Sequence, residues 1–159
     1  RSSACYMSYY LWFARKRNEL LKYISILMKK KILITGAAGY IGSFLTTKLL
    51  TIGYEIIAID NLSLSKNSLS HLFLNKNFSF IKGDVRNKKL ISKVIKKVDF
   101  IIPLAAIVGA PLCDRFPKLT KQVNLDSIKF ILKKIKKNQK IIYPNTNSGY
   151  GIGKKKGFL

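Results

Sequence analysis

The sequence predicts an α/β protein with a doubly wound parallel sheet, and three observations support this fold class. Short apolar runs alternate with longer segments whose apolar residues recur at helical spacing. The connections between consecutive runs have helical length, which favours parallel strands joined by right-handed crossovers. A glycine-rich stretch, residues 35–42, lies between the first apolar run and the first helical segment, where a tight turn is needed.

Each predicted element follows from a local pattern. The strands are buried apolar runs, and the helices carry an apolar stripe, as at Ile91, Val94 and Ile95. A polar stretch at 61–70 is predicted as a loop that can hold a short helix. Gly53 ends the first helix. The predicted strands cover residues 30–35, 54–60, 78–81, 99–106 and 140–143. The predicted helices cover residues 40–52, 90–98 and 118–137, and Pro111 and Pro117 are expected to break the loop before the last of them.

Five strands with these connections predict a Rossmann-type fold that is truncated after about the fifth strand. The chain has 159 residues, of which 48% are hydrophobic, and this suffices for one packed core. We expect that core in residues 28–159, because Met28 and three lysines directly precede the first strand.

Residues 1–27 are expected to be an extension outside the fold. Their aromatic cluster precedes their basic residues, which is the reverse of a secretory signal. An alternative is a helix that lies in a membrane interface. No apolar run reaches the ~18 residues of a membrane span, so none is predicted.

The formal net charge is +23, from 30 basic and seven acidic residues. Because the lysines are scattered over predicted helix faces, we interpret them mainly as a solvated surface and expect no specific nucleic-acid partner. A polyanion partner is the alternative interpretation.

Few residues of this chain are suited to bind metal. Cys5 and Cys113 are too few for a disulfide framework, and His71 is the single histidine, so no metal site is predicted. The low cysteine content favours a reducing, cytoplasmic location.

The glycine-rich turn is a candidate site for a diphosphate. A turn between a strand and a helix leaves backbone N–H groups exposed at the positive end of the helix. We expect Gly36 to permit the tight turn, Gly39 to let the backbone approach the phosphates, and Gly42 to let the helix pack closely on the strand.

Asp60 ends the second strand, 18 residues after Gly42. In a Rossmann-type sheet this carboxylate faces the adenosine ribose, where it accepts hydrogen bonds from both hydroxyls and repels a 2′-phosphate. It therefore predicts NAD rather than NADP as the cofactor. The alternative role of Asp60 is to start an Asx turn with Asn61.

Two further strand ends are candidate cofactor contacts. Asp84 is placed to accept a hydrogen bond from the adenine amino group while Val85 packs on the ring, although Gly83-Asp84 is also an ordinary turn. Small residues at the end of the fourth strand would let a cofactor lie against the sheet edge, or serve packing alone; they are Leu104, Ala105 and Ala106.

Motifs spread over residues 29–153 resemble the NAD-dependent epimerase/dehydratase family, the extended short-chain dehydrogenases that act on nucleotide sugars. They occur in order at familiar spacings: Thr35–Gly42, Asp60-Asn61-Leu62-Ser63, Gly83-Asp84-Val85-Arg86, Leu104-Ala105-Ala106, Val123-Asn124-Leu125 and Pro144–Gly151. The resemblance implies that Tyr40 and Ile41 contact the pyrophosphate. It implies that Asn124 supports the active-site backbone and a water molecule.

The resemblance also implies that Thr146 is the catalytic hydroxyl that hydrogen-bonds the reacting substrate oxygen, with Ser148 as its neighbour. A strand-end hydroxyl that caps the loop is the alternative role of Thr146. The family's acid/base pair, Tyr-x-x-x-Lys, is missing. Tyr150 and Lys154 match the bare pattern, but they lie in a glycine loop, where the two side chains would not share a helix face.

We therefore interpret the chain as the NAD-binding portion of a nucleotide-sugar epimerase or dehydratase, and expect it to be inactive alone. A nucleotide-sugar substrate and a homodimer are expected only for a full-length enzyme. A non-catalytic NAD-binding module or an inactive remnant is the alternative, and a basic nucleic-acid-associated protein is less favoured. The sequence does not indicate which sugar is bound.

Overall fold

The structure of the protein is a computed structural model that describes residues 15–19, 30–64 and 67–145. Most of the predicted extension at 1–27 lies outside these residues.

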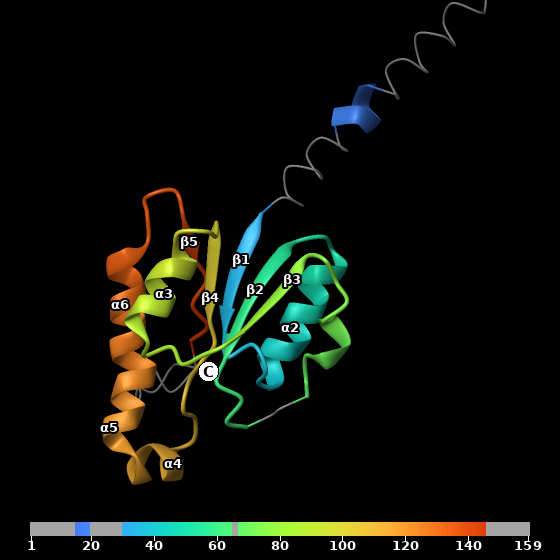
Figure 1. Cartoon of the computed structure of the whole chain (residues 1–159). Helices are drawn as coiled ribbons and strands as arrows, with labels where there is room; N and C mark the ends of the chain where they lie inside the picture. Colours follow the sequence, from blue (N-terminus) through green and yellow to red (C-terminus); the bar gives the residue numbers. More distant parts are fainter. Residues whose placement is uncertain (1–14, 20–29, 65–66, 146–159) are drawn as a thin grey trace, which may run out of the picture.

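Five parallel strands form one sheet in the order β3-β2-β1-β4-β5, which confirms the predicted fold class (Figure 1). From the central strand β1, the chain first builds outward to β2 and β3 and then crosses to β4 on the other side. The strands are β1 Lys31–Thr35, β2 Glu55–Asp60, β3 Phe78–Lys82, β4 Phe100–Pro103 and β5 Lys140–Ile141.

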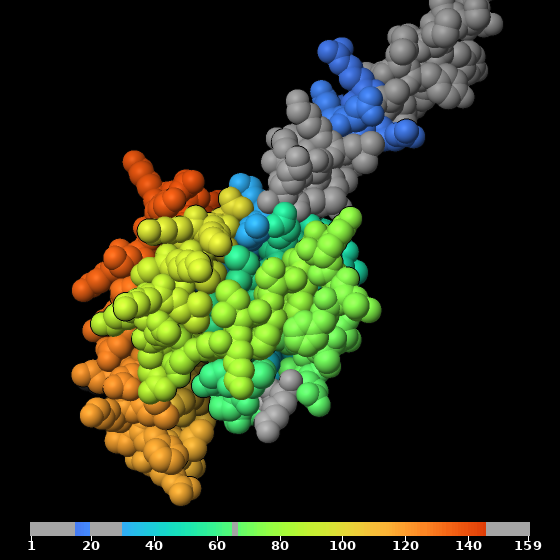
Figure 2. Space-filling model, in the orientation of Figure 1, coloured from blue at the N-terminus to red at the C-terminus, as the bar shows by residue number. Residues whose placement is uncertain are grey.

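Helices cover both faces of the sheet. Helix α2, Tyr40–Thr51, packs on one face, and helices α3, Lys88–Ile95, and α6, Ser127–Lys134, pack side by side on the other (Figure 1). The space-filling view shows the same contact between the α3 and α6 regions, in yellow-green and orange (Figure 2). A short 3₁₀ helix, η1 Ser70–Leu72, lies in the connection between β2 and β3.

The core consists of two apolar layers, one on each face of the sheet. In β1, Ile32 and Ile34 belong to the layer under α2, whereas Leu33 belongs to the layer under α3 and α6. Side chains of successive strand residues point to opposite faces, so a sheet covered on both sides needs apolar residues at every position. This explains the unbroken apolar runs that predicted the strands.

The segment after β4 differs from its prediction. Residues predicted as a broken loop form a helix, α4 Ala110–Arg115, and the predicted helix over 118–137 is divided into α5 Pro117–Thr120, the π-helical segment η2 Lys121–Asp126, and α6. Pro111 and Pro117 lie in the first turns of α4 and α5, where the missing N–H of proline costs no hydrogen bond. The expectation that these prolines break a loop was therefore wrong.

Three predicted elements extended too far toward the C-terminus. Strand β4 ends at Pro103, whereas the prediction ran to residue 106. Helix α6 ends at Lys134, because Ile135 adopts an extended backbone with ψ of 145°. Strand β5 contains only Lys140–Ile141 of the predicted 140–143. Gly53 follows the end of α2 with φ of 96°, as predicted. Within the part of the chain that the structure describes, no helix is long and apolar enough to cross a membrane.

Candidate functional site

A cavity of about 240 Å³ lies at the carboxyl ends of the strands, and we call it the strand-end cleft. It lies where the strand order reverses around β1, which is the usual ligand position in an open α/β sheet. Nine of the residues predicted for the site line it: Gly36, Gly39, Asp60, Asn61, Asp84, Val85, Leu104, Ala105 and Ala106. The structure thus brings together residues from four separate strand ends.

The glycine turn is held against β2 and β4 by close backbone contacts. The N–H of Gly36 donates to the carbonyl of Ile59 at 2.9 Å. Gly36 has φ of +70°, and a Cβ atom there would lie 2.5 Å from the backbone nitrogen of Ala105. A Cβ on Gly42 would meet the backbone of Gly36 and lie 2.8 Å from Cα of Ala37. Both positions therefore require glycine for packing within the protein.

Gly39 differs from the other two glycines of the turn. A Cβ atom there would meet only the carbonyl oxygen of Gly36, at 3.3 Å. Gly39 is the N-cap of α2 and provides no side-chain cap. Tyr40 and Ile41 begin the helix with exposed side chains and do not line the strand-end cleft. Because the first N–H groups of a helix lack acceptors within it, this end of α2 is suited to an anion.

Asp60 connects two segments of the cleft. Its Oδ2 accepts a hydrogen bond from the N–H of Ala38 at 2.9 Å, and its Oδ1 accepts one from Leu62 at 2.7 Å. The second bond is the Asx turn considered as the alternative role of Asp60. It holds Leu62 at φ of 60°, a left-handed conformation that is uncommon for a residue other than glycine. Each carboxylate oxygen has a second lone pair, so the turn leaves acceptor capacity for a ligand.

Asp84 is paired with Arg86, which the sequence analysis did not place in the site. The guanidinium donates from Nε to Oδ1 at 2.9 Å and from Nη2 to Oδ2 at 2.7 Å. Hydrogen bonding from Arg86 is the main reason that the pKa of Asp84 lies below its usual value of 3.8. The carboxylate of Asp84 is therefore ionised and held in one orientation.

Arg86 also links this loop to the π-helical segment. Its Nη1 donates to Oε1 of Gln122 at 3.2 Å. The position of Arg86 two residues after Asp84 was a usable signal for the ion pair. The contact with Gln122, 36 residues away, had no sequence signal.

Asn124 lies in η2 and binds the loop after β4. Its Oδ1 accepts from the N–H of Ile107 at 2.8 Å, and its Nδ2 donates to the carbonyl of Ile107 at 2.7 Å. Asn124 does not itself line the strand-end cleft, whereas Ile107 does. The side chain therefore positions the backbone that forms one wall of the cleft. At the start of the same loop, the N–H of Leu104 donates to the backbone carbonyl of Thr35 at 2.9 Å.

Thr146, the predicted catalytic residue, lies outside the described residues, as do Ser148, Tyr150 and Lys154. Among the residues that are described, no group of three or more His, Cys, Asp or Glu side chains could hold a metal ion.

Comparison with known proteins gives consistent results. The NAD dependent epimerase/dehydratase family matches residues 32–157. The bifunctional polymyxin resistance protein ArnA of Wigglesworthia glossinidia brevipalpis is 37% identical over 129 residues, which are 79% of this chain and 19% of that protein.

Solved structures of epimerases share the fold. An epimerase from Methanothermobacter thermautotrophicus has a TM-score of 0.72 and 30% identity, over 82% of this chain and 40% of that one. The UDP-glucuronic acid 4-epimerase from Bacillus cereus, solved with UDP-glucuronic acid and NAD, has a TM-score of 0.68 and 33% identity, over 81% of this chain and 43% of that one. The chain thus spans about two fifths of these structures and one fifth of ArnA.

Proposed function

The chain belongs to the NAD-dependent epimerase/dehydratase family, and from that premise we propose that it forms the NAD-binding part of an enzyme that epimerises or dehydrates a nucleotide sugar. The observation that carries the proposal is the strand-end cleft, where the N–H of Ala38 in the glycine turn donates a hydrogen bond to the carboxylate of Asp60. The complex of the Bacillus cereus epimerase with UDP-glucuronic acid and NAD supports the same cofactor and substrate class.

The residues of the cleft fit NAD. The space over Gly39 and the start of α2 suits a diphosphate. Gly39 has no side chain to block it, and the first N–H groups of the helix can donate hydrogen bonds to it. Asp60 retains acceptor capacity for ribose hydroxyls, and its negative charge opposes a 2′-phosphate. The ionised Asp84 supplies an acceptor for an adenine amino group beside the buried Val85.

When bound, NAD supplies a hydride acceptor for a substrate carbinol. The loop held by Asn124 would form the wall against which the cofactor lies, and Thr146 would hydrogen-bond the reacting sugar oxygen. A proton acceptor for the same hydroxyl is expected from the Tyr-x-x-x-Lys pair of a full-length enzyme.

The cofactor proposal is tested by the equilibrium affinity of the whole chain for NAD and NADP, measured by calorimetry. We expect saturable binding of NAD and much weaker binding of NADP. Asp60→Asn keeps one acceptor oxygen but removes the negative charge. It should weaken NAD binding about tenfold or more, as expected for the loss of a charged hydrogen bond, and should reduce the preference for NAD over NADP.

Asp114→Asn is the matched control, because Asp114 is exposed in α4 and does not line the cleft. It should leave both affinities unchanged. Equal binding of NAD and NADP by the unchanged chain would contradict the proposed role of Asp60, and an absence of NAD binding would contradict the proposed function.

A further inference from the structure

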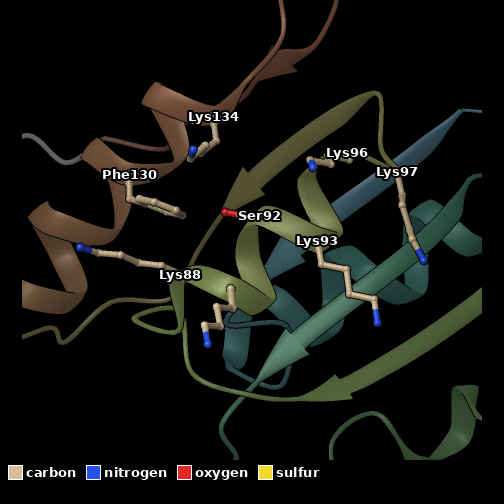
Figure 3. Close-up of a pocket in the computed structure, with 8 residues that line it drawn as sticks. Lys88, Ser92, Lys93, Lys96, Lys97, Phe130 and Lys134 are labelled. Carbon is tan, nitrogen blue, oxygen red and sulfur yellow. The ribbon is translucent and has the colours of Figure 1, made fainter.

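An open, shallow depression of about 610 Å³ lies over the exposed side of α3 and beside α6, away from the glycine turn. We call it the lysine hollow (Figure 3). Its lining consists of six lysines with one serine and one aromatic ring: Lys88, Lys89, Lys93, Lys96, Lys97, Lys134, Ser92 and Phe130. Five of these lysines lie in α3 or directly after it, and the fold adds Lys134 and Phe130 from α6, more than 30 positions later in the sequence.

The lysine hollow has no acidic group in its lining. Within the described residues, the three ion pairs lie elsewhere: Lys30 with Asp99, Lys31 with Glu55 and Arg86 with Asp84. All six lysines are exposed. Like charges that share one surface raise the local concentration of anions, and this effect is strongest at low ionic strength.

Phe130 gives the hollow an aromatic surface. Its ring reaches from α6 toward α3, with Lys88 and Lys134 on either side (Figure 3). Each ammonium nitrogen lies 5.8 Å from the ring centroid, within the range of a cation–π contact. The ring is half-buried, so its position is fixed by the fold while part of it remains accessible.

We propose that the lysine hollow binds single-stranded nucleic acid, with the lysines on consecutive phosphates and Phe130 against a base. A groove of positive charge combined with an aromatic surface is the usual means of binding a single strand without sequence preference. Helix α3 has eight residues and is about 12 Å long, so its exposed lysines form a row that a backbone of phosphates can follow.

An anionic membrane is less well matched to this surface. Membrane-surface helices combine basic residues with apolar side chains that enter the lipid. No large exposed apolar side chain lines the lysine hollow, and its single ring is half-buried. Lys88 and Phe130 also line a neighbouring depression that contains Asp84 and Asp126. These acidic residues limit the positive surface on that side.

The test compares two variants of equal net charge. The first replaces Lys88, Lys93, Lys96 and Lys134 by glutamine. The second replaces four exposed lysines outside the hollow, Lys48, Lys76, Lys82 and Lys118, by glutamine. The affinity of each full chain for a fluorescent poly(U) oligonucleotide is measured over a range of salt concentrations, and NAD binding is measured on the same samples as a check of folding.

We expect the hollow variant to lose most of its affinity and to reduce the salt slope by about 2 to 3, since each phosphate contact contributes about 0.7 on a single strand. The control variant should keep most of its affinity and most of its salt slope. Equal losses in the two variants would show that binding follows net charge alone and would overturn the proposal. Binding of phosphatidylserine vesicles, but not of poly(U), through the same four lysines would also overturn it.

Phe130→Leu separates stacking from charge. Leucine fills a similar space in the α3–α6 contact but has no aromatic face, so the affinity for poly(U) should fall several-fold with the salt slope unchanged. An unchanged affinity would remove Phe130 from the site and leave a purely electrostatic surface.

Discussion

The two sides of the strand-end cleft are built by different means. On one side, Gly36 and Gly42 bring backbone against backbone, with no room for a side chain. On the other side, the loops after β3 and β4 are held by the side chains of Arg86 and Asn124. Steric contacts tolerate no added atom, whereas hydrogen bonds can be removed one at a time. A single substitution on the glycine side should therefore cause a large loss in the free energy of unfolding. On the other side, each hydrogen bond that is removed should cause a smaller loss.

The largest effect is expected from Gly36→Ala. The added Cβ would lie 2.5 Å from the nitrogen of Ala105, and alanine is strained at φ of +70°. Because the obstacle is backbone, the free energy of unfolding should fall by about 3 kcal/mol or more, measured by urea denaturation.

Gly39→Ala is the matched control for that prediction. Its Cβ would meet one carbonyl oxygen at 3.3 Å and its φ of −71° is ordinary, so the free energy of unfolding should change by about 1 kcal/mol or less. NAD affinity should nevertheless fall, because the methyl group occupies the space proposed for the diphosphate. Similar losses of stability in both variants would contradict the steric difference between the two positions.

An intermediate effect is expected from Asn124→Ala on the polar side. The change removes both hydrogen bonds to Ile107 and leaves one N–H and one carbonyl without partners. We expect a loss of about 2 kcal/mol in the free energy of unfolding, at about 1 kcal/mol for each group. Asn124→Asp keeps the acceptor for the N–H of Ile107 but places a carboxylate oxygen against its carbonyl oxygen, so it should be no more stable than the alanine variant. A stability close to that of the unchanged chain in either variant would contradict the role of these two hydrogen bonds.

The smallest effect is expected from Arg86→Met. Hydrogen bonding from Arg86 lowers the pKa of Asp84 from its usual value of 3.8, so the ion pair stabilises the folded protein at pH values above 3.8. This stability is lost as the pH falls through the folded-state pKa. Removal of Arg86 should cost less than about 1 kcal/mol near neutral pH, because the pair is partly exposed. It should also flatten the decline of stability below pH 3.8, measured by urea denaturation across that range.

Gln122→Ala is the control for Arg86→Met. It removes the contact with the π-helical segment but keeps the ion pair with Asp84, so it should preserve the acid dependence. A flattened acid profile in this variant would indicate that Gln122, rather than the direct ion pair, governs Asp84.

The sequence predicted the parts of the molecule that depend on local pattern. Gly36, Asp60 and Asp84 were placed at strand ends because apolar runs of buried strands have a clear length and boundary. The register of the last helical region was not predictable, since the π-helical segment contacts Ile107 through Asn124, 17 residues later, and neither segment alone indicates that contact. The lysine hollow was hidden in part, because the sequence shows the lysines of α3 but not that Phe130 and Lys134 of α6 lie beside them.

The π-helical segment has a consequence for the angular phase of the helix that contains it. Each residue of an α-helix turns the chain by about 100°, and a π-helical turn adds one residue without adding a turn. This added residue sets the rotation of α6 about its axis relative to α5. The side chain of Asn124 then faces the loop after β4, while that of Phe130 faces α3. A deletion of one residue within Lys121–Asp126 would restore the α-helical phase and turn one of these side chains away by about 100°. The wall of the strand-end cleft and the aromatic surface of the lysine hollow are thus coupled by the winding of one short segment.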